Sequence, residues 1–157
     1  MEPNEIKLRA IGYVRNNQVR DPQKKNWVEI KSEIILNPEL TPAMERIEDY
    51  SHLVIISWLH QITERGRRRK KISCVKVGGG TRGVFATRAP FRPNPIGIAI
   101  VKLFSVRGNI LEVLGLDVFD GTPILDIKPY TGHPRDLVLD FKSPEILNQP
   151  SIHLKKT

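Results

Sequence analysis

Apolar and polar side chains alternate along much of this chain, with the period of two that is typical of half-buried β-strands. In the stretch Ile6–Val14, for example, Ile6 and Leu8 alternate with Lys7 and Arg9. The same pattern, together with runs rich in β-branched and aromatic residues, indicates several further strands. We predict strands over residues 6–14, 27–36, 51–61, 72–77, 96–106, 111–119 and 124–127.

Turn and helix signals separate these strands. Thr41 and Pro42 are typical of an N-cap and a first helical position, and they predict a short acidic helix that ends near Asp49. Asp120–Pro123 predicts a hairpin turn that leads into the last strand, and residues 144–147 indicate a late helical turn. Seven or so short strands with little helical periodicity predict an all-β domain with minor α content, built as a barrel or sandwich. The 157 residues fit one domain.

One glycine-rich segment has the spacing of the dinucleotide-binding motif of Rossmann folds. Gly78–Gly83 matches the spacing G-x-G-x-x-G and follows the strand predicted at 72–77. A dinucleotide site needs a helix directly after the glycines and an acid about 20 residues further on. Here three prolines follow instead, and no Asp or Glu occurs before Glu112. We therefore interpret the glycines as a turn that allows a close backbone approach and predict no Rossmann fold.

Composition and the N-terminal residues favour one cellular compartment. No apolar stretch of about 18 residues occurs, and Met1–Glu5 is acidic and polar, so we expect neither a transmembrane helix nor a secretory signal. Cys74 is the single cysteine and cannot form an internal disulfide. Because it lies in an apolar strand pattern, we interpret it as a small buried residue. These features favour a cytoplasmic protein without a membrane partner.

The charge is concentrated in one segment. The formal net charge is +8, and twelve Lys or Arg residues without a single acid lie between Arg65 and Leu111. The densest run is Arg67, Arg68, Arg69, Lys70 and Lys71. Such a run can be a solvated loop, but a one-signed segment of this length favours a polyanionic partner. Membrane-surface binding is the weaker alternative, because the run lacks the bulky apolar residues of an amphipathic helix.

Residues 83–97, with the sequence GVFATRAPFRPNPIG, form the first candidate site. Their three prolines are incompatible with a helix interior or a central strand, and they predict a stiff, extended loop. The loop carries Phe85, Arg88, Phe91, Arg92 and Asn94. Arginines and phenylalanines at fixed spacing suit an anionic ligand with a ring. The structural alternative is a connection whose phenylalanines fill the core.

Residues 120–130, with the sequence DGTPILDIKPY, form the second candidate site. Asp126, Lys128 and Tyr130 follow one another at spacings of two, so they project from the same face of a strand. An acid, a cation and a phenol can form a small polar site or, alternatively, a structural ion pair. No metal site is predicted, because the four histidines, His52, His60, His133 and His153, are scattered and lack the spacing of metal ligands.

These two motifs, in this order and about twenty residues apart, resemble the TsaA-like family of tRNA (adenine-N6)-methyltransferases of the TrmO type. The likeness covers roughly residues 6–135 and leaves 136–157 as a C-terminal tail. It implies a compact, single-domain β-barrel that binds S-adenosyl-L-methionine without a Rossmann domain and works as a homodimer. The implied substrate is the threonylcarbamoyl-modified adenosine beside the anticodon of tRNA, which is methylated on N6.

The resemblance also implies a cofactor site. The family's cofactor-binding positions correspond to residues at the end of the strand predicted over 51–61, in or next to the proline-rich loop 83–97, and in the turn before the last strand. These positions are His60, Gln61, Arg88, Ile98, Phe119, Asp120, Gly121 and Thr122. The family's Pro-Arg-Gln-type segment is reduced here to Pro22 and Gln23, which follow Asp21.

For the reaction, we expect an acceptor or base near the N–H of the methylated nitrogen. Our hypothesis is that Asp126 or Tyr130 takes this role, while Lys128, Arg92 and Asn94 bind or orient the modified base. Arg67–Lys71 is the expected tRNA-binding run. Two other functions remain open at this point: a non-catalytic RNA-binding barrel with Phe85 and Phe91 stacking on bases, and a cofactor-binding regulator or an enzyme that acts on another nucleotide.

Overall fold

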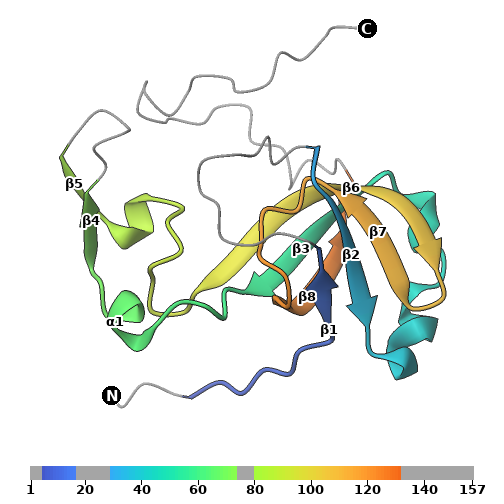
Figure 1. Ribbon diagram of the computed structural model, residues 1–157, viewed down its shortest axis with the longest axis horizontal. Coiled ribbons are helices and arrows are strands. Elements are labelled where there is room, and N and C mark those ends of the chain that lie inside the picture. Colours follow the sequence, from blue (N-terminus) through green and yellow to red (C-terminus); the bar gives the residue numbers. More distant parts are fainter. Residues whose placement is uncertain (1–4, 17–28, 74–79, 132–157) are drawn as a thin grey trace, which may run out of the picture.

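The computed structural model describes residues 5–16, 29–73 and 80–131, and these residues form a closed six-stranded antiparallel barrel (Figure 1). The strands are β1 (Gly12–Arg15), β2 (Lys31–Leu36), β3 (His52–Trp58), β6 (Ile96–Arg107), β7 (Ile110–Leu114) and β8 (Pro123–Pro129). Their order around the barrel is β1-β2-β7-β6-β3-β8, and β8 closes it by pairing with β1. The prediction of an all-β fold without a Rossmann domain is confirmed.

Alternating apolar residues fill the barrel. Ile34 on β2, Leu53 and Ile55 on β3, and Leu111 and Val113 on β7 have no exposed side-chain surface. Each lies two positions from its neighbour on the same strand, as the period of a strand requires. The core therefore follows from the alternation in the sequence. It also contains residues from segments between the strands, among them Met44, Leu116 and Val118.

The turn at Asp120–Pro123 does not form the predicted hairpin. β7 ends at Leu114 and pairs with β2 and β6, whereas β8 pairs with β3 and β1. The strand predicted over residues 111–119 therefore stops early, and residues 115–122 cross the end of the barrel as a loop. The apolar alternation continues through this loop because Leu116 and Val118 are buried in the core, although they belong to no strand.

Further element boundaries differ from the predictions. The first strand begins at Gly12 rather than residue 6, and Ile6 and Leu8 are exposed. The predicted helix over 41–49 is instead two 3₁₀ helices, Pro38–Met44 and Ile47–Asp49. The first of them begins after Asn37, with Pro38 rather than Pro42 near its N-terminus, and the Thr41 hydroxyl donates to the Pro38 carbonyl at 2.7 Å. The predicted helical turn at 144–147 lies outside the described residues.

A small unit projects from one end of the barrel. It comprises α1 (Glu64–Arg67), β4 (Lys71–Ser73) and β5 (Thr81–Gly83), and it lies at the left of Figure 1. Because it carries the run Arg67–Lys71, we call it the basic unit. β4 and β5 form a separate two-stranded sheet. A short 3₁₀ helix, Val84–Ala86, connects β5 to the proline-rich loop. The run predicted as a basic loop is thus part helix and part strand, while Cys74, Gly78 and Gly79 lie outside the described residues.

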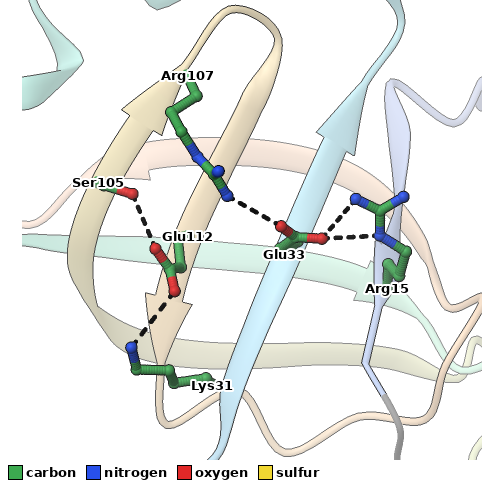
Figure 2. Close-up of polar contacts among 6 residues, drawn as sticks. All are labelled: Arg15, Lys31, Glu33, Ser105, Arg107 and Glu112. Carbon is green, nitrogen blue, oxygen red and sulfur yellow. Dashed lines mark hydrogen bonds and ion pairs between the residues drawn. The ribbon is translucent and has the colours of Figure 1, made fainter.

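Charged side chains cover the outer face of β1, β2 and β7 (Figure 2). Glu33 on β2 accepts from Arg15 on β1 at 2.6 Å and from Arg107 on β6 at 3.1 Å. Glu112 on β7 accepts from Ser105 at 2.9 Å and pairs with Lys31 at 3.4 Å. These contacts link β1, β2, β7 and the end of β6, with Arg107 reaching Glu33 across β7, so this face satisfies its charges within the barrel. We call it the polar face.

The outer face of β3 and β6 is apolar by contrast. Cross-strand neighbours there are Val54 with Ile100, Ile56 with Ile98, and Trp58 with Ile96. On β6 the side chains of Ile98 and Ile100 are 56% and 55% exposed. Adjacent apolar pairs of this kind form a contiguous hydrophobic surface, which is typical of an interaction site. We call these six residues the apolar face.

Candidate functional site

A cleft of about 520 Å³ opens at the end of the barrel where β3 ends and β6 begins. Four segments line it: residues 57–62 after β3, residues 88–92 of the proline-rich loop, residues 96–99 of β6, and residues 117–122 of the loop before β8. Six of the residues predicted to bind the cofactor line this cleft. They are His60, Gln61, Arg88, Ile98, Phe119 and Thr122. Asp120 and Gly121 lie in the same loop, between two of the lining residues.

The proline-rich loop is fixed by hydrogen bonds to its surroundings. A guanidinium nitrogen of Arg88 donates to the carbonyl of Ile98 at 3.2 Å, which ties the loop to β6. Arg92 donates to the carbonyls of Val84 and Thr87 at 3.4 and 3.3 Å. The stiff backbone expected from the prolines is therefore reinforced by its own arginines. Arg88 and Arg92 both line the cleft, which gives this wall a positive charge.

The close pairing of β3 with β6 shapes the floor of the cleft. Gly97 on β6 is opposite Ser57 on β3. A Cβ at position 97 would lie 2.7 Å from the Ser57 hydroxyl and 3.0 Å from a methyl group of Leu59. A side chain there would collide with both neighbours, so the sequence needs glycine where the two strands approach most closely.

The loop before β8 is held from both sides. The amide of Gly121 donates to the Val14 carbonyl at 2.8 Å, and the Val14 amide donates to the Thr122 carbonyl at 2.9 Å. Asn16 donates its side-chain amide to the Val118 carbonyl, and its backbone N–H donates to the Asp120 carboxylate at 2.7 Å. Gly121 has a φ of 71°, which allows the tight turn. Thr122 is 2% exposed. This wall is thus rigidly attached to β1.

Two arginines of the basic run pack on aromatic rings beside the cleft. The guanidinium of Arg67 lies 5.0 Å from the ring centre of Trp58, and that of Arg69 lies 4.8 Å from the ring centre of Phe91. Gly66 is buried, and a Cβ there would lie 3.0 Å from a methyl group of Ile62 and 3.2 Å from the ring of Phe91. These cation–π contacts attach the basic unit to the barrel and to the proline-rich loop.

The other cations of this run are directed to solvent. Arg65, Arg68, Lys70 and Lys71 are exposed, and none has an ion-pair partner in the part of the chain that the structure describes. Asn94 is also exposed, and Phe85 is 80% exposed. Phe85 therefore does not fill the core, whereas Phe91 packs under Arg69. The basic unit and the cleft are neighbours because both contact the proline-rich loop.

Asp126, Lys128 and Tyr130 are not brought to the cleft. Asp126 lines a second cavity, of about 610 Å³, at the opposite end of β3 and β8, between the 3₁₀ helices and β8. Its carboxylate pairs with Lys128 at 2.6 Å, which is the ion pair left open as the structural alternative. The Tyr130 amide donates to the His52 carbonyl at 2.9 Å and so belongs to the same distant end.

Asp117 is a cleft residue that sequence reasoning missed. It lines the cleft next to the predicted turn, and desolvation by the atoms around it raises the pKa of its carboxyl above the ordinary value. Its position in an alternating apolar run resembles an outward-facing strand residue, and no motif distinguishes it. Only the crossing of residues 115–122 over the barrel end reveals its location.

Several predictions can be placed only in part. Pro22, Gln23 and the histidines His133 and His153 lie outside the described residues. His52 contacts Ser51, with 2.9 Å between a ring nitrogen and the hydroxyl. Within residues 5–16, 29–73 and 80–131, no three His, Cys, Asp or Glu side chains are grouped as a metal site requires. No helix in these ranges is long and apolar enough to cross a membrane.

Residues 13–134 match the family described as the tRNA-methyltransferase O N-terminal domain. The chain belongs to this family. The resemblance to TrmO-type proteins inferred from the two motifs is therefore confirmed. The family match includes most of β1, and all of the basic unit, the proline-rich loop and β8, so every described wall of the cleft lies inside it.

Individual relatives support the same assignment. A probable S-adenosyl-L-methionine-binding protein of Methanothermobacter thermautotrophicus is 39% identical over 140 residues, which cover 83% of this chain and 93% of the relative. The tRNA (adenine(37)-N6)-methyltransferase of Mus musculus is 35% identical, over 99% of this chain and 36% of the relative. A crystal structure of TrmO matches with a TM-score of 0.71 and 31% identity, over 89% of this chain and 64% of that chain. This TrmO-family chain thus spans about a third of the mouse enzyme.

Proposed function

We propose that this protein transfers the methyl group of S-adenosyl-L-methionine to N6 of adenosine 37 in tRNA. Membership of the TrmO family supports this proposal, as does the name of the mouse relative. The main support comes from the structure. Residues from four separate segments line one cleft beside a basic surface, and six of these residues were predicted to bind the cofactor. The finer proposal is that the adenosine already bears a threonylcarbamoyl group. The reaction takes place in the cytoplasm.

The cleft suits the cofactor in size and chemistry. About 520 Å³ lies within the range of roughly 300–1,000 Å³ for small-molecule sites. Ile98 and Phe119 offer apolar surface for the adenine ring, and the Arg88 guanidinium suits the carboxylate of the methionine part. His60, Gln61 and Thr122 add polar groups that can fix its orientation. When bound, the cofactor supplies an activated methyl group, and the protein positions it for in-line transfer.

The tRNA binds to the basic unit in this proposal. Because Arg67 and Arg69 pack on Trp58 and Phe91, their role includes holding the unit in place. Arg68, Lys70 and Lys71 extend into solvent and bind phosphates. Arg92 and Asn94, on the adjoining loop, contact the substrate base. The neighbouring positions of the basic unit and the cleft bring the anticodon region of the tRNA to the methyl donor.

The protein acts as a homodimer in this proposal, and the apolar face is the surface that meets the second copy. Ile96 and Ile98 belong both to this face and to the wall of the cleft. A second copy seated there would bury exposed isoleucine side chains and would also border the cleft. The polar face has its charges paired already, so it offers no comparable gain.

The catalytic roles of Asp126, Lys128 and Tyr130 stay a prediction. The ion pair between Asp126 and Lys128 and the place of Asp126 in the second cavity favour a structural role for these two residues within one subunit. Replacing Asp126 by Asn and measuring single-turnover methylation separates the two readings. An unchanged rate with unchanged stability removes Asp126 from the mechanism.

The proposed function is tested by mass spectrometry of tRNA nucleosides after incubation with the protein and labelled S-adenosyl-L-methionine. Parallel reactions use tRNA with and without the threonylcarbamoyl group. We expect label on N6 of the adenosine beside the anticodon. Unlabelled tRNA, together with the absence of heat on calorimetric titration with the cofactor, would instead favour the second candidate, a non-catalytic RNA-binding barrel that uses the exposed cations of the basic unit.

A further inference from the structure

Asp117 has a special place in the cleft. It is the only carboxylate among the described residues that line it, and the other titratable or charged side chains there are His60, Arg88 and Arg92. His60 follows the end of β3, and the two arginines come from the proline-rich loop. The nearby Asp120 belongs to the same loop as Asp117, but its carboxylate accepts the amide of Asn16.

The backbone around Asp117 is fixed. Its neighbours Leu116 and Val118 are 0% and 7% exposed and belong to the barrel core. The Gly115 amide donates to the Ile30 carbonyl at 3.0 Å, and the Val118 carbonyl accepts from Asn16 at 3.2 Å. Because both neighbours are anchored in the core, the backbone that carries the Asp117 carboxylate is fixed at the cleft wall.

The carboxylate is also available for chemistry. Across the described residues, no hydrogen bond or ion pair engages the Asp117 side chain. Asp117 is exposed at the cleft, but desolvation by the atoms around it raises the pKa of its carboxyl, so its ionised form is a stronger base than an ordinary aspartate. Acidic groups held in clefts with a raised pKa and without a structural partner are typical of catalytic acids and bases.

We propose that Asp117 is the general base of the methyl transfer, an inference that rests on the proposed function. N6 of the adenosine carries a proton and a delocalised lone pair, so it is a weak nucleophile until that proton leaves. As the N6–carbon bond forms, the carbon–sulfur bond of the sulfonium breaks and its electron pair remains on sulfur. The proton of N6 moves to the Asp117 carboxylate and then passes to water.

The same carboxylate could instead accept hydrogen bonds from the ribose hydroxyls of the cofactor. The two roles predict different effects when the carboxylate of Asp117 is replaced by a neutral group. A ribose ligand contributes to cofactor affinity, whereas a general base contributes to the rate of the chemical step and leaves affinity unchanged.

The test compares the wild type with Asp117→Asn in single-turnover methylation at saturating tRNA and cofactor. We expect the rate to fall at least about 100-fold, the lower end of the usual contribution of a general base. Calorimetric titration with S-adenosylhomocysteine should give the wild-type affinity. Asp117→Glu keeps a carboxylate and should retain more of the rate than Asp117→Asn. The wild-type rate should fall at acid pH, as Asp117 is protonated, and Asp117→Asn should lack this dependence.

The matched control is Asp49→Asn, which removes an acid that pairs with Arg46 at the opposite end of the barrel. Its rate should equal that of the wild type, and thermal unfolding should show that all variants fold. A wild-type rate in Asp117→Asn, or a loss of cofactor affinity that accounts for its defect, overturns the general-base role alone. Absence of methylation by the wild type overturns the proposed function as well.

Discussion

On one outer face of the barrel, charged side chains of β1, β2, β7 and the end of β6 are paired with one another, whereas the cross-strand positions of β3 and the first part of β6 hold apolar side chains. Glu33 joins Arg15 and Arg107 on the polar face. Ile98 and Ile100 remain more than half exposed on the apolar face. One surface of the barrel thus pairs its own charges, whereas the other exposes apolar side chains that a partner could bury.

The two outer faces also differ in their distance from the cleft and the basic unit. The apolar face borders the cleft through Ile96 and Ile98, and the basic unit adjoins the same cleft through Trp58 and Phe91. The polar face has no comparable neighbour. Features that concern other molecules are therefore gathered around β3 and β6, while β1, β2 and β7 complete the barrel and anchor the loop that carries Asp117.

The largest expected effect comes from placing a charge on the apolar face. Ile100→Asp would bury a carboxylate without a partner in the proposed dimer, and Ile100 is outside the cleft lining. Because such burial costs several kcal/mol, the dimer dissociation constant should rise by about 100-fold or more. Analytical ultracentrifugation over a concentration series measures it. Arg107→Asp, on the same strand but on the polar face, is the control and should leave the dimer intact.

A smaller effect is expected from removing cations at the basic unit. Replacing Arg68, Lys70 and Lys71 together by Ala should weaken tRNA binding and lower the slope of log affinity against log salt by about 2 to 3. Fluorescence anisotropy with labelled tRNA at several salt concentrations gives both quantities.

The control for this triple variant removes the same number of cations from the polar face. Arg15, Lys31 and Arg107 are engaged with Glu33 and Glu112, so their loss should change the slope little. Equal slopes for the two triple variants would mean that net charge alone governs binding and that the basic unit has no special role.

The smallest effect concerns Glu112 on the polar face. The hydrogen bond from the Ser105 hydroxyl, aided by Lys31 and opposed by burial, lowers the pKa of Glu112 below its ordinary value of 4.5. The charged form therefore stabilises the fold above pH 4.5, and this contribution is lost as the pH falls through the lowered pKa. Chemical denaturation should show Glu112→Gln to be slightly less stable than the wild type at neutral pH. The two proteins should converge in acid; a gap that widens there would contradict the sign.

Local patterns in the sequence predicted most of the strands, whereas the cleft residues came from the resemblance to the TrmO family. Alternation places Ile34, Ile55 and Val113 inside the barrel, and the two motifs indicate Arg88 and Thr122. The hairpin predicted at Asp120–Pro123 was wrong because β8 pairs with β3 and β1, which lie far away in the chain, and turn residues such as Asp120 and Gly121 look alike in hairpins and in crossing loops.

The position of single polar residues was harder to predict. Asp126 shares a strand face with Lys128, as expected, but its distance from the cleft depends on which end of β8 meets β3, and that is a property of the assembled barrel. Asp117 follows the same alternation as a strand residue. Its contact with the cleft arises only because residues 115–122 leave the sheet while Leu116 and Val118 stay in the core.

The central claim is that the cleft between β3, the proline-rich loop and residues 117–122 binds the methyl donor. A crystal structure of the protein with S-adenosylhomocysteine tests it directly. We predict that the ligand lies in this cleft, with its carboxylate at Arg88 and contacts to Phe119 and Thr122. A ligand bound in the second cavity beside Tyr50 and Asp126 would contradict the account.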